Sequence, residues 1–128
     1  MQIVRLAATD MTPEIAFDPE RHRLEVRGHC QPHRIEVLFR PLLLLLRRHF
    51  SQHQPQFFNV TLALDYVDKA SVAALRELFV LLDGEGRCGR WIEVIWSCAA
   101  EDEAHAGLVS LLMDGLPNIE FHCEAPAA

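Results

Sequence analysis

The chain has 128 residues, of which 50% are hydrophobic and 23% charged, so it can bury a core and is not a disordered polymer. Twelve basic against eighteen acidic residues give a net charge of −6, which disfavours a nucleic-acid-binding surface. Residues 1–50 hold eight arginines and six acids, whereas residues 51–128 hold four bases and twelve acids. Such an uneven charge distribution suits a protein partner better than a polyanion.

The first ten residues lack the charged and apolar regions of a secretory signal. The longest apolar run, Leu42–Leu46, is far shorter than the roughly 20 residues that span a bilayer. Four scattered cysteines without a CxxC motif are typical of reduced thiols. We therefore expect a cytoplasmic protein without membrane insertion.

Two alternating segments, Glu14–Asp18 and Leu24–Arg27, predict an opening hairpin. An apolar stripe at helical spacing runs from Ile35 to Phe50, and Pro41 inside it predicts either a kink or the start of a new helix. Phe57–Tyr66 is rich in β-branched and aromatic residues, which predicts a central strand.

A second helix is predicted from Ser71, with Gly84 and Gly86 ending it. We expect its inward residues to be Val72, Leu75, Leu78, Phe79 and Leu82, and its outward residues to be Arg76, Glu77 and Asp83. Three further elements are predicted: a strand at Trp91–Trp96, a third helix from Glu101 that buries Leu108, Leu111 and Leu112, and a strand at Ile119–Cys123.

The resulting order is β-β-α-β-α-β-α-β. Alternating strands and helices at short spacing favour right-handed crossovers and parallel strands, whereas the opening hairpin is antiparallel. The sequence therefore predicts one α/β domain over residues 1–128, with a core at about 12–123 and a mixed sheet that carries its helices on one face.

Enzyme signatures are sparse. The chain has no Walker loop, GxGxxG, GxSxG or HExxH motif. Histidine and cysteine side chains that suit zinc lack paired spacing, so we predict no metal and no cofactor. A small metal- or ligand-dependent enzyme is the alternative, and it requires several of these side chains to converge in a pocket: His29, Cys30, His33, His105 and His122.

Two polar segments are candidate functional sites. Glu101, Asp102 and Glu103 suit the first turn of a helix, where free N–H groups stabilise acids, and partner contact is the second interpretation. The segment Asp68-Lys69-Ala70-Ser71 follows a predicted strand, and Asp68 is placed to cap the next helix. Lys69 is the chain's single lysine, and a cation there opposes the helix dipole, so it suggests a partner or a lost function.

Five segments in order carry a resemblance to a known family: Thr12–Asp18, Leu24–Pro32, Phe39–Leu42, Leu64–Tyr66, and Ile95-Trp96 followed by Glu101–Glu103. From about Thr12 to His122 the chain resembles the SiaC family of bacterial regulatory phosphoproteins. That family looks like the STAS domains of anti-sigma-factor antagonists, and the resemblance implies a STAS-like fold.

The resemblance also implies a non-enzymatic switch. A kinase phosphorylates a Thr or Ser at the strand-to-helix turn, a PPM-type phosphatase removes the phosphate, and the unmodified protein binds and activates a diguanylate cyclase that controls cyclic di-GMP and biofilm formation. A phosphoryl group adds about −1.5 to −2 charge, enough to block or create a docking surface. The partner-binding residues so implied are Pro32, His33, Arg34, Tyr66, Trp96, Glu101, Asp102 and Glu103.

This chain departs from the family at the turn. The family pattern is Tyr-(Phe/Leu)-Asn-Thr-Ser-Ser, whereas the chain reads Tyr66-Val-Asp-Lys-Ala-Ser71, so Lys69 replaces the acceptor Thr. Pro32-His33-Arg34 stands for the family's Pro-Glu-Asn, and Cys98 for a tyrosine. We expect an adaptor with an altered switch, and the alternative is a conventional switch that uses Ser71.

Overall fold

The computed structural model describes residues 4–6, 14–30, 35–67, 69–97 and 110–124. It contains eight named helices and strands in these ranges. They are β1 (Val4–Leu6), β2 (Glu14–Asp18), β3 (Arg23–Cys30), α1 (Ile35–His53), β4 (Phe57–Val67), α2 (Lys69–Arg87), β5 (Trp91–Ser97) and β6 (Glu120–Glu124).

The strands form one six-stranded sheet in sequence order, β1-β2-β3-β4-β5-β6. The first three strands are antiparallel neighbours, and the pairs from β3 to β6 are parallel. This confirms the predicted mixed sheet with an opening hairpin. One strand was not predicted: β1 has only three residues and pairs only with β2 at the edge of the sheet.

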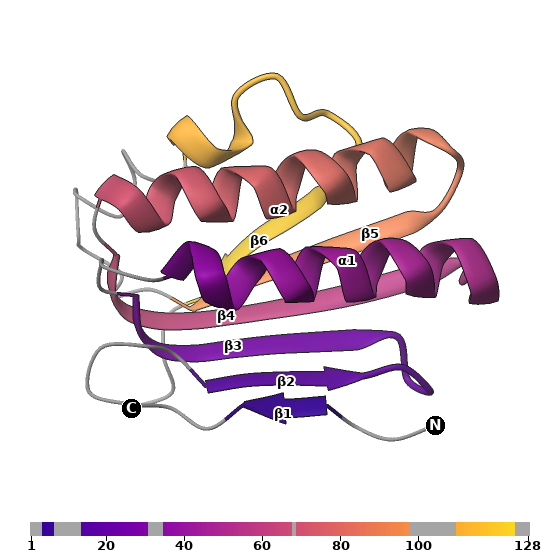
Figure 1. Ribbon diagram of the computed structural model, residues 1–128. Helices are drawn as coiled ribbons and strands as arrows, with labels where there is room; N and C mark the ends of the chain where they lie inside the picture. Colours follow the sequence, from indigo (N-terminus) through magenta and orange to yellow (C-terminus); the bar gives the residue numbers. More distant parts are fainter. Residues whose placement is uncertain (1–3, 7–13, 31–34, 68, 98–109, 125–128) are drawn as a thin grey trace.

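Both helices cover the same face of the sheet, as predicted (Figure 1). Strand residues alternate between buried and partly exposed, because neighbouring side chains point to opposite faces. The buried set from the strands is Ile15, Phe17, Leu24, Val26, Phe58, Val60, Leu62, Ile92, Val94 and Trp96. The core therefore lies between this face and the two helices.

The first helix is one continuous element, with an exposed Pro41 inside it. Of the two predicted alternatives, a new helix starting at Pro41 is therefore wrong. Its predicted stripe is buried at every position whose side chain the structure describes, namely Phe39, Leu42, Leu43, Leu46 and Phe50. None of the helices in the described ranges is long and apolar enough to cross a membrane.

The second helix begins at Lys69 and continues through both glycines to Arg87, so the predicted stop at Gly84 and Gly86 is wrong. The true stop is followed by Gly89, whose φ of 97° suits glycine. Gly86 serves packing instead, because a Cβ there would collide with the backbone carbonyl oxygen of Asn118. Glycine at this position lets the segment before β6 lie against the helix.

Asp83 was expected to face solvent, but it is 3% exposed. Its Oδ1 accepts a hydrogen bond from the Asn118 backbone N–H at 2.8 Å, and Oδ2 lies 3.6 Å from Nη2 of Arg87. On the same helix, half-buried Arg76 donates to the carbonyl oxygens of Leu111 and Leu112. These polar side chains fasten the segment 111–118 to α2.

The predicted third helix falls mostly outside the described residues. Its described part, 110–113, is helical. Leu112 is buried as expected, but Leu111 is 64% exposed, so its predicted place in the core is wrong. Neighbouring residues of a helix point in different directions, and here only Leu112 meets the core.

Candidate functional site

The candidate site lies where three parallel strands end. Parallel strands place their carboxyl ends at the same edge of a sheet. Cys30 at the end of β3 pairs with Val67 at the end of β4, and Ser97 at the end of β5 pairs with Ala63. The carboxyl ends of β3, β4 and β5 lie along one edge of the sheet (Figure 1), which we call the strand-end edge. In the sequence, the predicted site residues stand at or shortly after the last positions of these strands.

The structure describes the predicted site residues unevenly. Seven of them lie outside the described residues: Pro32, His33, Arg34, Asp68, Glu101, Asp102 and Glu103. For Tyr66, Lys69, Ala70 and Ser71 it gives the place of the backbone: Tyr66 is in β4, and the other three begin α2. The described topology thus places the ends of β3, β4 and β5 and the start of α2 at one edge of the sheet.

Trp96 does not lie on a binding surface. Its side chain is 0% exposed, because it shares the helix-facing side of β5 with Ile92 and Val94. We therefore count Trp96 with the core rather than with the partner-binding residues. The strand alternation visible in the sequence is the signal that places it there.

Lys69 is the first residue of α2, and Ser71 is the third. The first turn of this helix holds no acidic residue. Its free backbone N–H groups and helix dipole favour a negative charge, whereas Lys69 brings a positive one. These N–H groups and the helix dipole would stabilise a phosphoryl group at this turn.

A β-bulge lies close to the strand-end edge. The pairing of β3 with β4 shifts between Gly28 and His29, so that Gly28 pairs with Leu64 but His29 with Tyr66. Gly28 has a φ of 114°, a conformation that glycine adopts at little cost. The bulge therefore sets the register of the last residues before the predicted contact segment.

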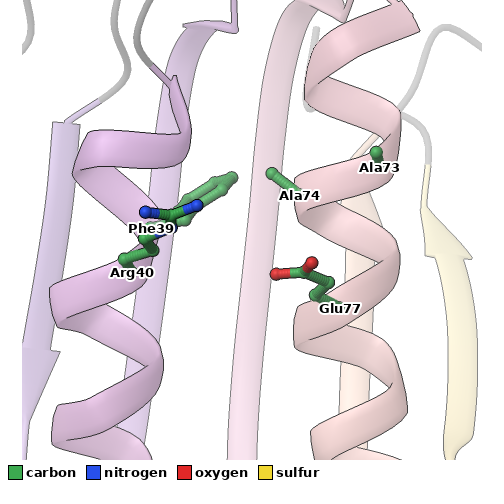
Figure 2. Close-up of a pocket in the computed structure, with 5 residues that line it drawn as sticks. All are labelled: Phe39, Arg40, Ala73, Ala74 and Glu77. Atoms are coloured by element: carbon green, nitrogen blue, oxygen red, sulfur yellow. The ribbon is translucent and has the colours of Figure 1, made fainter.

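A shallow cavity of about 70 Å³ lies between the helices, within two turns of the start of α2. Figure 2 shows Phe39 and Arg40 on α1 pointing toward α2, and Ala74 and Glu77 on α2 pointing toward α1. Ala73 also lines the cavity. Small-molecule sites usually measure about 300–1,000 Å³, so this one has room for water rather than for a substrate. The sequence analysis did not single out these residues as a set.

The alternative metal site finds no support in the described part of the chain, where no three histidine, cysteine or acidic residues could hold a metal ion. His122 lies on β6, with its Nε2 3.9 Å from a carboxylate oxygen of Glu93. His29 and Cys30 are described as backbone in β3. His33 and His105 lie outside the described residues.

Sequence reasoning missed a group of three other histidines, which we call the histidine cluster: His22, His49 and His53. Nδ1 of His22 and Nε2 of His49 lie 2.9 Å apart and share a hydrogen bond. The His49 and His53 rings have centroids 5.0 Å apart. The four-residue spacing of His49 and His53 could have revealed two of the three histidines, but only the fold adds His22.

The comparisons with known proteins agree with this geometry. A sequence profile of the SiaC family of regulatory phosphoproteins matches residues 6–125. No match was found among curated protein sequences. Apo-SiaC from Pseudomonas aeruginosa is 23% identical, with a TM-score of 0.85 over 98% of this chain and 100% of that one.

A second solved structure shows the P. aeruginosa diguanylate cyclase SiaD in complex with its activator SiaC, and it contains a similar chain. That match has 23% identity and a TM-score of 0.84, and it covers 95% of this chain and 98% of the other. At this identity, the structural matches establish the fold. The profile match over nearly the whole chain goes further: this protein is a regulatory protein rather than an enzyme and belongs to the SiaC family.

Proposed function

We propose that this chain is a cytoplasmic adaptor that binds and activates a diguanylate cyclase, with the family's phospho-switch altered at Lys69. The observation that carries the proposal is the place of Lys69 as the first residue of α2, at the strand-end edge. The acceptor Thr of the family pattern corresponds to this position. The SiaC relative in complex with the cyclase SiaD supports the class of partner.

An altered switch follows from the chemistry of lysine. Its ammonium group cannot take the place of the acceptor hydroxyl, and it keeps a positive charge where the phosphorylated family member has about −1.5 to −2. Since the unmodified form is the one that activates the cyclase in the family, this chain stays competent to bind. The output is therefore set by its abundance rather than by a kinase and phosphatase acting at residue 69.

A conventional switch that uses Ser71 is the second candidate. Ser71 lies in the first turn of α2, and that turn contains no acidic residue to repel a phosphate. Negative charge is stabilised at this end of a helix by about 0.3–1 kcal/mol. In this case a kinase and phosphatase pair still controls the protein, two residues further along the helix.

The contacts with the cyclase are proposed to come from Pro32, His33, Arg34, Tyr66 and residues 101–103. They lie in segments at or after the ends of three neighbouring strands, so one partner surface can span them. Arg34→Ala and Glu103→Ala should each weaken binding about fivefold or more, the effect of losing about 1 kcal/mol. Arg23→Ala is the matched control, because exposed Arg23 begins β3 at the other edge of the sheet.

The test combines the purified chain with a diguanylate cyclase from its host and measures binding and cyclic di-GMP production. We expect activation by the wild-type chain, before and after treatment with a cognate kinase and ATP. Lys69→Thr should become sensitive to that treatment, and Lys69→Ala should not. Ser51→Thr, at an exposed position of α1, is the control for a new threonine outside the switch.

Two results would change the assignment. Loss of wild-type activation after kinase treatment, with phosphate on Ser71, would establish the second candidate instead. If the chain binds none of the host's diguanylate cyclases, the proposed partner is wrong whatever the state of the switch.

A further inference from the structure

The histidine cluster surrounds one buried imidazole. His49 is 4% exposed, and rings of Phe17, Phe50 and Phe58 lie 5.2–6.0 Å from it between centroids. Two further rings, those of His22 and His53, complete its surroundings at 5.1 and 5.0 Å. A buried imidazole with mostly phenyl neighbours is poorly placed to carry a charge.

His22 belongs to the turn between β2 and β3, and it is held in an uncommon conformation. Its φ is 53°, in the left-handed region that non-glycine residues rarely adopt. Its carbonyl oxygen accepts a hydrogen bond from the Asn59 N–H at 2.9 Å, and Asp18 Oδ1 accepts from the N–H groups of Glu20 and Arg21. The bond to His49 adds a tertiary contact to this turn.

We propose that the histidine cluster is a proton-sensitive latch, which holds the β2–β3 turn against the end of α1 and releases it when His49 takes up a proton. A neutral His49 offers or accepts one hydrogen bond at Nε2, and His22 fills that position. If His49 is protonated while His22 also carries a proton on Nδ1, both nitrogens become donors and the bond is lost. Release of the turn then lets water reach the charged ring.

The electrostatics of the cluster favour this response. The pKa of His49 is lowered from 6.5 to about 4, first by burial and then by repulsion from His22 and His53. These are the titratable neighbours that act on it, from the turn and from α1, whereas β2 and β4 contribute the phenyl rings of Phe17 and Phe58. Opening therefore becomes easier at each pH below 6.5, down to about 4.

The latch also reaches the surface. The His22 ring packs edge-on against Phe57, with centroids 5.5 Å apart. Phe57 pairs in register with Trp91 of β5, and both side chains are exposed, at 45% and 56%. Movement of His22 therefore changes the contact that the partly exposed Phe57 ring makes with the turn.

Amide hydrogen exchange of residues 19–24 tests the latch in the full-length protein. If His49 has a pKa of 6.5 when the turn is open, the opening constant should rise about 30-fold from pH 7.5 to pH 5, after correction for intrinsic exchange rates. His49→Gln should remove most of this rise, since glutamine does not titrate. His122→Gln, which changes an exposed histidine on β6, should keep the rise in the opening constant.

An equal opening constant at both pH values would overturn the proposal. So would an equal loss of protection in the centres of β4 and β5, because that would be global unfolding rather than release of one turn. If His49→Gln does not fold, NMR titration of the wild-type imidazoles decides the question. A His49 that titrates together with exposed His122, without any change at the turn, contradicts the latch.

Discussion

The two ends of the parallel strands differ in how far apart in the sequence their residues of interest lie. At the strand-end edge, each candidate residue stands near the end of a strand or within six positions after it in the sequence, so spacing along the chain points to it. At the opposite edge, His22 meets His49 across 27 positions, and no local pattern joins them. Candidate residues near the ends of strands can be predicted from the sequence. A cluster whose members are distant in sequence, such as His22 and His49, can be found only once the fold is known.

The largest effect should come from the core that both ends share. Leu46→Ala removes a fully buried side chain of α1 and should lower the free energy of unfolding by about 2–5 kcal/mol. Leu44→Ala changes a neighbour that is 66% exposed and should cost less than about 0.5 kcal/mol. Urea denaturation of both variants measures the difference, and equal losses would contradict the packing of α1.

The hydrophobic patterns explain how much of the fold could be predicted. Alternation located β2 and β3, β-branched and aromatic residues located β4, and helical spacing located the buried faces of α1 and α2. The errors arose where contacts distant in sequence decide the outcome. Asp83 is buried because the backbone N–H of Asn118 donates a hydrogen bond to it. Gly86 lies inside α2 rather than at its end, and its lack of a Cβ leaves room for the carbonyl oxygen of Asn118.

At the strand-end edge, too, some features could be predicted from the sequence and others could not. The sequence located the start of α2 within two residues and the ends of β4 and β5 within one. It misplaced Trp96 because an aromatic side chain near a strand end suits either a core or an interface, and burial decides between them. The bulge at Gly28 depends on pairing with β4, which no single segment encodes.

His49 in the histidine cluster should make the stability of the fold depend on pH. The pKa of His49 is about 4 in the folded chain and near 6.5 in the unfolded one, so the unfolded state binds more protons between these values. Stability is therefore full above pH 6.5 and falls as the pH falls toward 4. His49 should account for about 2 kcal/mol of loss between pH 7.5 and 5.

Denaturation of the wild-type chain and His49→Gln at both pH values isolates this contribution. The wild type should lose more stability on acidification than the variant does, by the amount given above. The same pH dependence in both proteins would show that His49 does not cause it.

Alanine substitutions at two glycines of α2 should change stability by smaller amounts and in opposite directions. Gly86→Ala forces a Cβ against the carbonyl oxygen of Asn118 and should destabilise the fold by about 1 kcal/mol or more. Gly84→Ala meets nothing within 4 Å and should stabilise the helix by about 0.5–1 kcal/mol. Thermal unfolding should therefore shift in opposite directions, and a shared direction would contradict the close approach of residue 118.

The central claim is the proposal that residues 66–71 hold the place of the family's switch, with Lys69 in place of the acceptor Thr. Phosphopeptide mapping of the protein purified from its host tests this most directly. The account predicts no phosphate on residues 66–71 in any growth state, while the chain remains bound to its cyclase. Stoichiometric phosphate on Ser71 would contradict it and show that the switch has moved by two residues along α2.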